Sequence, residues 1–70
     1  MTFAALDQAA YAMAWNDPAR NDVNYLIAHA DDNAADDAGK LESLRCLLSF
    51  DGAHRSPAAI AWFAARGIVA

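Results

Sequence analysis

The last segment of the chain constrains the fold most, because it contains the signals for both ends of one helix. Ser56 can cap that helix by accepting a hydrogen bond from a free backbone N–H group, and Pro57 suits the first helical position. Gly67 can adopt the left-handed conformation that ends a helix, with Ile68 folding back onto the last turn in a Schellman motif. We therefore expect a helix over about residues 57–66.

The tryptophan of this expected helix lies away from its apolar face. At about 100° per residue, that face carries Ala59, Ile60, Phe63 and Ala64. Trp62 points roughly 100° or more away from both Phe63 and Ile60. It therefore needs a contact of its own, either on another helix of the chain or on a partner.

The N-terminal segment predicts a first helix over about residues 3–15 that is apolar on nearly every side. One stripe, at spacings of three and four, consists of Phe3, Leu6, Ala10 and Met13. A second stripe, on nearly the opposite side, consists of Ala4, Tyr11 and Trp15. A helix of this kind is normally buried on more than one side. We expect it either at the centre of the fold or in an interface with a partner or a second copy.

Two further helices are predicted between these segments. Asp17 as cap and Pro18 as first residue predict a helix over about residues 18–30, and a leucine seam predicts another over about 34–50, ended by Asp51–Gly52. The apolar stripes of the two helices are Ala19, Val23, Leu26, Ile27 and Ala30, and then Leu41, Leu44 and Leu48, widened by Leu47 and Phe50. No strand pattern appears, so the expected fold class is all-α, a compact bundle of four short helices.

Length and charge limit what such a bundle can bind. Residues 1–70 make one domain at most, and nine acidic against five basic residues give a net charge of −4 at pH 7. This charge disfavours direct binding to nucleic acid or to an anionic membrane. The final helix offers base edges a single arginine, Arg66, which is too little for sequence readout. A protein partner with a basic surface is favoured instead.

The absence of targeting signals predicts a cytoplasmic protein. Nothing near Met1 combines basic residues with an apolar run as in a signal peptide, and no stretch reaches the ~20 apolar residues of a membrane span. The single cysteine, Cys46, cannot form a disulfide within the chain and fits a reducing compartment. Because Cys46 lies off the leucine seam with no base beside it, we expect a partly buried, inert thiol.

The sequence offers no catalytic, cofactor or metal site. Asp22, Tyr25 and His29 share one face of the second helix, but that face should be solvated, and catalysis needs a concave, partly dry site. A calcium loop starting at Asp31 fails because Ala35 has no side-chain oxygen and no glycine stands at the sixth position. We therefore expect neither an enzyme nor a metal-binding protein.

An acidic segment, residues 31–37, has two other interpretations. Its acidic residues are Asp31, Asp32, Asp36 and Asp37. They can cap the third helix and complement its dipole, or they can form a patch for a basic partner. The sequence leaves both open, as it leaves open whether Trp15 and Trp62 belong to the core or to an interface.

These features lead to the hypothesis of a small acidic protein-binding module. It would be a diffusible inhibitor that covers a basic, nucleic-acid-binding surface of a larger protein. By size and charge alone, phage-encoded anti-host and anti-CRISPR proteins are of this general type. The expected contact residues are Trp62, Arg66, Tyr11, Trp15, Asp31, Asp32, Asp36 and Asp37. The alternative is a homodimeric structural or accessory subunit, in which the first helix and both tryptophans lie between two copies.

Overall fold

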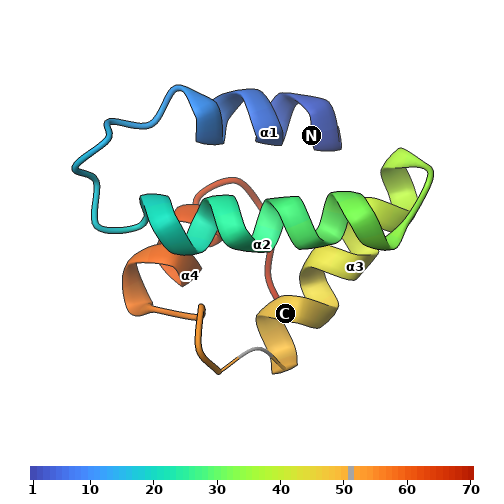
Figure 1. The fold of residues 1–70 in the computed structure, drawn as a ribbon. Coiled ribbons are helices and arrows are strands. Elements are labelled where there is room, and N and C mark those ends of the chain that lie inside the picture. Colours follow the sequence, from blue (N-terminus) through green and yellow to red (C-terminus); the bar gives the residue numbers. More distant parts are fainter. Residues whose placement is uncertain (51) are drawn as a thin grey trace.

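The computed structural model describes residues 1–50 and 52–70, which form four α-helices and no strand. The helices are α1 (Phe3–Tyr11), α2 (Arg20–Asn33), α3 (Asp37–Phe50) and α4 (Pro57–Ala64), as Figure 1 shows. The expected fold class, a small all-α bundle of four helices, is confirmed. The expected role of Asp51 in ending the third helix lies outside the described residues.

The central helix is α2, because it packs against all three of the others. α1 lies alongside α2 and runs in the opposite direction (Figure 1). α2 buries Val23, Leu26 and Ala30 completely, as its apolar stripe predicted. α1 buries one face only, through Phe3 and Leu6 together with an alanine. Of the two places expected for the first helix, the structure therefore excludes the central one.

α1 is shorter than predicted and ends at Tyr11 instead of residue 15. The backbone N–H of Met13 donates to the carbonyl of Ala10 at 3.2 Å, in a turn tighter than that of an α-helix. Met13 packs against the core from this turn. Trp15, in the connection that follows, is exposed. A longer helix would therefore gain no stabilisation from burying this side chain.

The start of α2 differs slightly from the prediction. Asp17 Oδ1 accepts a hydrogen bond from the backbone N–H of Ala19 at 2.9 Å. Asp17 therefore caps a separate turn, and the regular helix begins at Arg20, two residues later than expected. α2 also continues to Asn33, three residues beyond its expected end. Differences of this size are usual when helix ends are predicted from sequence.

The start of α3 confirms one interpretation of the acidic segment. α3 begins at Asp37, three residues later than predicted, and Asp36 precedes it as the cap. Asp36 Oδ1 accepts a hydrogen bond from Gly39 N at 2.7 Å, and its carbonyl accepts one from Lys40 N at 3.0 Å. Asp36 is therefore used within the chain to satisfy the first free N–H groups of α3.

α4 has both of its predicted capping signals. Ser56 Oγ accepts a hydrogen bond from Ala59 N at 3.2 Å, which confirms the N-cap. At the other end, Gly67 has a φ of +80°, and Ile68 N donates to the carbonyl of Phe63 at 3.0 Å. These features confirm the Schellman motif. The regular helix ends two residues earlier than predicted, because those two residues belong to the closing turn.

The core combines side chains from all four helices. Its largest fully buried members are Phe63, Leu6, Leu26, Leu44 and Val23. On α4, half of the predicted apolar face is covered, through Ala59 and Phe63. Ile60 and Ala64, which were predicted on the same face, are exposed. The apolar stripe of α4 is therefore wider than the core that covers it.

Two residues of α3 are more exposed than predicted. Phe50 is 84% exposed instead of widening the leucine seam, and Cys46 is exposed instead of partly buried. Each is two residues from the buried Leu48, so at 100° per residue its side chain points about 160° away from it. Cys46 and Phe50, four residues apart, therefore share the solvent face of α3.

Candidate functional site

The outer face of α1 is exposed to solvent. We call it the α1 face, and it consists of Ala4, Asp7, Gln8, Tyr11 and, in the connection after the helix, Trp15. Tyr11 is 93% exposed and Trp15 is 82% exposed. Aromatic side chains exposed to this extent are more usual at binding surfaces than elsewhere on a small protein.

An acidic hollow lies beside the N-terminal half of α1. It has a volume of about 260 Å³, and its lining consists of Phe3, Ala4, Asp7, Asp31, Asp37 and Lys40. Lys40 Nζ lies 2.7 Å from Asp31 Oδ1 and 5.6 Å from the centre of the Phe3 ring. The hydrogen bond to Asp31 raises the pKa of Lys40, and the charges of Asp31, Asp37 and Asp36 raise it further.

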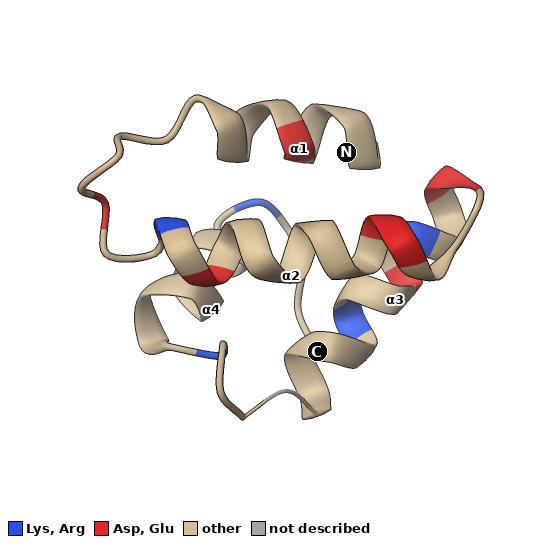
Figure 2. Ribbon diagram, viewed as in Figure 1, with Lys and Arg blue, Asp and Glu red and all other residues tan. Residues whose placement is uncertain are grey.

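The net charge of the protein is concentrated at this end. We call the group Asp7, Asp31, Asp32, Asp36, Asp37 and Lys40 the acidic end. Figure 2 shows acidic positions, in red, at the end of α2 and the start of α3, and one more on α1. Five carboxylates and one ammonium group give it a net charge of −4, which equals that of the whole chain. The other four acidic residues of the sequence are balanced by its four arginines. A cationic surface is therefore attracted to this end.

The four aspartates of the acidic segment differ in their roles. Asp36 caps α3 and Asp31 pairs with Lys40, as described above. Asp37 Oδ1 accepts a hydrogen bond from the backbone N–H of Phe3 at 2.6 Å, so this carboxylate joins α3 to the start of α1. Asp32 is exposed and, among the described residues, makes no side-chain hydrogen bond or ion pair. The cap interpretation therefore applies to Asp36, whereas Asp32 is the aspartate left available for a basic partner.

Tyr11 and Trp15, the aromatic pair, lie near the start of α2, whereas the acidic segment lies at its end. Residues 12–19 lead into its start, residues 31–37 include its end, and its 14 residues span about 20 Å. α1 connects the two regions, because Asp7 borders the acidic hollow while Tyr11 lies four residues further along the same helix. Residues four apart are neighbours on a helix surface. On α1, the border of the acidic hollow at Asp7 and the exposed ring of Tyr11 are therefore neighbours on one surface.

Trp62 and Arg66 lie apart from this face, on α4 and its closing turn. Trp62 is half-buried, packs against the core and meets the Phe63 ring edge-on, with ring centres 5.2 Å apart. The Arg66 guanidinium carbon lies 3.8 Å from the centre of the Trp62 ring, and Nη1 donates to the Trp62 carbonyl at 2.8 Å. The structure thus gives Trp62 a partner within the chain and leaves Trp15 exposed.

An aromatic cluster that the sequence did not predict joins α2 to the connection before α4. The ring of Tyr25 lies 4.2 Å from that of His29 and stacks on that of His54, with centres 3.4 Å apart and planes 12° apart. Sequence periodicity placed Tyr25 and His29 on one face of the second helix. It carries no signal for His54, which comes from another segment. Within the described part of the chain, no group of three or more histidine, cysteine or acidic side chains is arranged to hold a metal ion.

Comparisons with known protein families, with curated proteins and with solved structures gave no match. Among the described helices, none has the length and hydrophobicity needed to span a bilayer.

Proposed function

We propose that the protein is a binding module that covers a basic surface of a larger protein with its α1 face. The observation that carries this proposal is the position of Tyr11, which is 93% exposed and one turn from Asp7 at the border of the acidic hollow. The face thus offers aromatic contact area and negative charge together. In protein interfaces, aromatic contact area contributes to affinity, and complementary charge contributes to fast, oriented association.

The aromatic pair has enough apolar area to matter for binding. Covering a large apolar side chain that was exposed to water contributes about 1.5–3 kcal/mol. Tyr11 and Trp15 present such area at no cost to the core, because neither belongs to it. Aromatic residues of this type commonly form the energetic centre of an interface.

The finer part of the proposal is inhibition by occlusion. The acidic end carries the whole net charge, so the surface it complements is one rich in lysine and arginine, such as a nucleic-acid-binding surface. A module that covers such a surface competes with the nucleic acid for it. Phage-encoded anti-host and anti-CRISPR proteins are of this general type by size and charge, and we place this protein beside them as a hypothesis.

A second copy of the chain is the competing partner for the α1 face. Two copies joined through this face would bring together two chains that each have a net charge of −4. Salt screens that repulsion, so a homodimer of this kind strengthens as ionic strength rises. Binding to a basic partner weakens under the same change, because attraction between opposite charges is screened. The sign of the salt dependence therefore separates the two functions.

The test is affinity capture from a lysate of the cells that express the protein, together with light scattering of the free protein, at about 0.05 M and about 0.5 M NaCl. We expect a stoichiometric partner at low salt, less of it at high salt, and a monomer throughout. The double variant Tyr11→Ser, Trp15→Ser should lose the partner at both salt concentrations. The double variant Asp7→Asn, Asp32→Asn should lose most of the captured partner at low salt, because it has less negative charge to attract a basic surface.

The matched control is Phe50→Ser. Phe50 is 84% exposed but lies on α3, away from the α1 face, so its replacement should leave capture unchanged. A dimer that tightens with salt and dissociates in the Tyr11 and Trp15 double variant would overturn the proposal in favour of the accessory subunit. Equal loss of the partner in the Phe50 variant would overturn the assignment of the face.

A further inference from the structure

Asp7 and Tyr11 place an unpaired carboxylate and an exposed ring one turn apart on the α1 face. Asp7 is exposed and, within the described residues, its side chain makes no hydrogen bond or ion pair. Tyr11, four residues later, is 93% exposed. Side chains at this spacing are neighbours on a helix surface. One group of a ligand can therefore contact the carboxylate and the ring together.

The guanidinium group of an arginine suits both contacts. It is planar, so it stacks on an aromatic ring, and its fork of N–H donors binds both oxygens of a carboxylate. The ammonium group of a lysine is more strongly hydrated and has no plane to stack. Cations found over aromatic rings in proteins are accordingly more often arginine than lysine. Asp7 and Tyr11 together therefore favour arginine among the basic side chains.

The chain already contains one such arrangement, on α4. The guanidinium carbon of Arg66 lies 3.8 Å from the centre of the Trp62 ring, and Nη1 donates to the Trp62 carbonyl at 2.8 Å. Stacking and a hydrogen bond to an oxygen thus act on the same cation. Trp15, in contrast, is 82% exposed, and within the described residues no cation lies over its ring or over that of Tyr11. Both rings are open to a guanidinium group from outside.

The charge beside these rings also favours a cation. The lining of the acidic hollow, which Asp7 borders, has three carboxylates, those of Asp7, Asp31 and Asp37, and one ammonium group, that of Lys40. Lys40 is paired with Asp31 at 2.7 Å, and Asp37 accepts the hydrogen bond from the backbone of α1. Asp7 is the carboxylate of this lining that has no partner. Charge complementarity therefore assigns a cationic group to Asp7.

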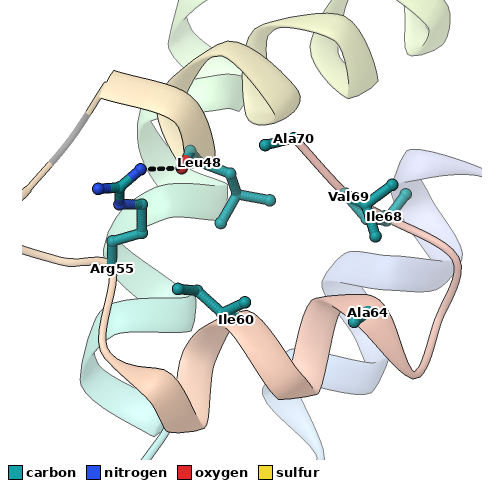
Figure 3. A pocket seen from close by; sticks show the side chains of 7 residues that line it. All are labelled: Leu48, Arg55, Ile60, Ala64, Ile68, Val69 and Ala70. Atoms are coloured by element: carbon teal, nitrogen blue, oxygen red, sulfur yellow. Dashed lines mark hydrogen bonds between the residues drawn. The ribbon is translucent and has the colours of Figure 1, made fainter.

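A second hollow differs in each of these respects. It lies between α3, α4 and the segment after α4, has a volume of about 170 Å³, and is lined by Leu48, Arg55, Ile60, Ala64, Ile68, Val69 and Ala70 (Figure 3). This lining has no aromatic ring and no acidic side chain. Arg55 is held at the end of α3, because its Nη1 donates to the carbonyls of Leu48 at 3.1 Å and Ser49 at 3.0 Å. This hollow is therefore an internal control for binding to the α1 face.

We propose that the α1 face binds an arginine-rich segment of the partner protein, with one guanidinium group between Asp7 and Tyr11 and another on the ring of Trp15. This inference rests on the proposed function and specifies the chemistry of its partner. A surface rich in lysine has the same charge but lacks the planar group that stacks on the two rings. The α1 face therefore discriminates between basic surfaces by their arginine content.

The test is an NMR titration of the isotopically labelled chain at about 0.05 M NaCl with two short peptides that have blocked ends. One peptide alternates arginine with glycine, and the other alternates lysine with glycine. We expect shifts of the amides of Asp7 and Tyr11 and of the indole N–H of Trp15, and none at Ile60 or Ile68 in the second hollow. The Kd for the arginine peptide should be about fivefold lower than that for the lysine peptide.

Variants of the α1 face separate stacking from charge. The double variant Tyr11→Leu, Trp15→Leu keeps apolar side chains but removes both rings, so its Kd for the arginine peptide should rise to that for the lysine peptide. Asp7→Asn should raise both Kd values, because both peptides are cationic. Phe50→Leu is the matched control and should change neither Kd. Phe50 is also an exposed ring, but the residue one turn before it is Cys46 and not a carboxylate.

Equal Kd values for the two peptides, with shifts on the α1 face, would overturn the inference and leave the proposed function in place, because a basic partner would still bind. Shifts confined to other residues, or an arginine preference that survives the loss of both rings, would overturn the inference as well. Failure of the proposed function has a different result, a dimer that tightens with salt in the light-scattering experiment. The two failures are therefore distinguishable.

Discussion

The carboxylate of Asp37 accepts a hydrogen bond from the backbone N–H of Phe3 at 2.6 Å, across 34 residues of sequence. Asp37 is the first residue of α3, and Phe3 is the first residue of α1. One negative charge therefore lies beside the N-terminal ends of two helices, where unpaired N–H groups and the helix dipoles both favour an anion. This contact fixes the acidic end of the α1 face against the rest of the fold.

Replacing this carboxylate should destabilise the whole domain. Asp37→Ala leaves the N–H of Phe3 without its acceptor, and hydrogen bonds to charged groups contribute about 1.5–3 kcal/mol. We expect a loss of that size in the free energy of unfolding, measured with urea. Asp37→Asn should lose less, because its amide oxygen can still accept the hydrogen bond. Asp32→Ala is the matched control, and a change beyond about 0.5 kcal/mol there would contradict the assignment to this one contact.

Stability at alkaline pH should depend on Lys40. The hydrogen bond to Asp31 raises the pKa of Lys40 in the folded protein. A raised pKa means that the stabilisation is fully present below the unfolded value of about 10.4 and is lost as pH rises through the folded value. Lys40→Met should therefore be less stable than wild type at neutral pH, and urea unfolding should show this difference disappearing at strongly alkaline pH.

The control for this pH dependence is another ion pair of α3. Arg45 Nη1 lies 3.6 Å from Glu42 Oε2, and an arginine keeps its charge throughout the accessible range. Any small difference between wild type and Arg45→Met should therefore persist at alkaline pH. A Lys40→Met difference that stays constant from neutral to alkaline pH would show that Lys40 acts by packing on Phe3 and not by its charge.

Gly67 should be intolerant of a side chain for a purely conformational reason. Its φ is +80°, whereas no atom lies within 4 Å of the place a Cβ would take. The left-handed conformation costs a residue with a Cβ about 1–2 kcal/mol, so Gly67→Ala should lower the free energy of unfolding by that amount. Gly52→Ala is the matched control, because its Cβ position is equally open and its φ is not positive. A similar loss in both variants would mean that the Schellman turn is not the cause.

The sequence was sufficient for the fold class because the signals that decide it act within a few residues. Ser56 bonds to the helix it precedes, and Gly67 ends the helix it follows. The stripe of α2 was correct because the amphipathic pattern there is unambiguous. Helix ends were less accurate, since a tight turn such as the one at Asp17 competes with the helix for the same N–H groups.

The candidate site was only partly predictable, because its geometry depends on how the helices pack. Asp37 was expected as a cap or a contact, but nothing near it in sequence indicates Phe3 as its partner. The stacking of His54 on Tyr25 has the same origin, since the two rings come from different segments. The acidic segment was visible in the sequence. That it lies close to Asp7 could not be predicted, because this depends on how α1 packs against α2 and α3.

The two tryptophans should differ in their access to solvent, which sequence alone left open. Trp15 is 82% exposed, whereas Trp62 packs against Phe63 and is covered on one face by the guanidinium of Arg66. In Trp62→Phe, the fluorescence of Trp15 should be quenched by acrylamide almost as strongly as that of the urea-unfolded chain. In Trp15→Phe, quenching should be several-fold weaker, and Arg66→Met in that background should strengthen it by removing the cation over the ring. Equal quenching of the two folded variants would mean that Trp15 is covered in solution, as a second copy on the α1 face would do.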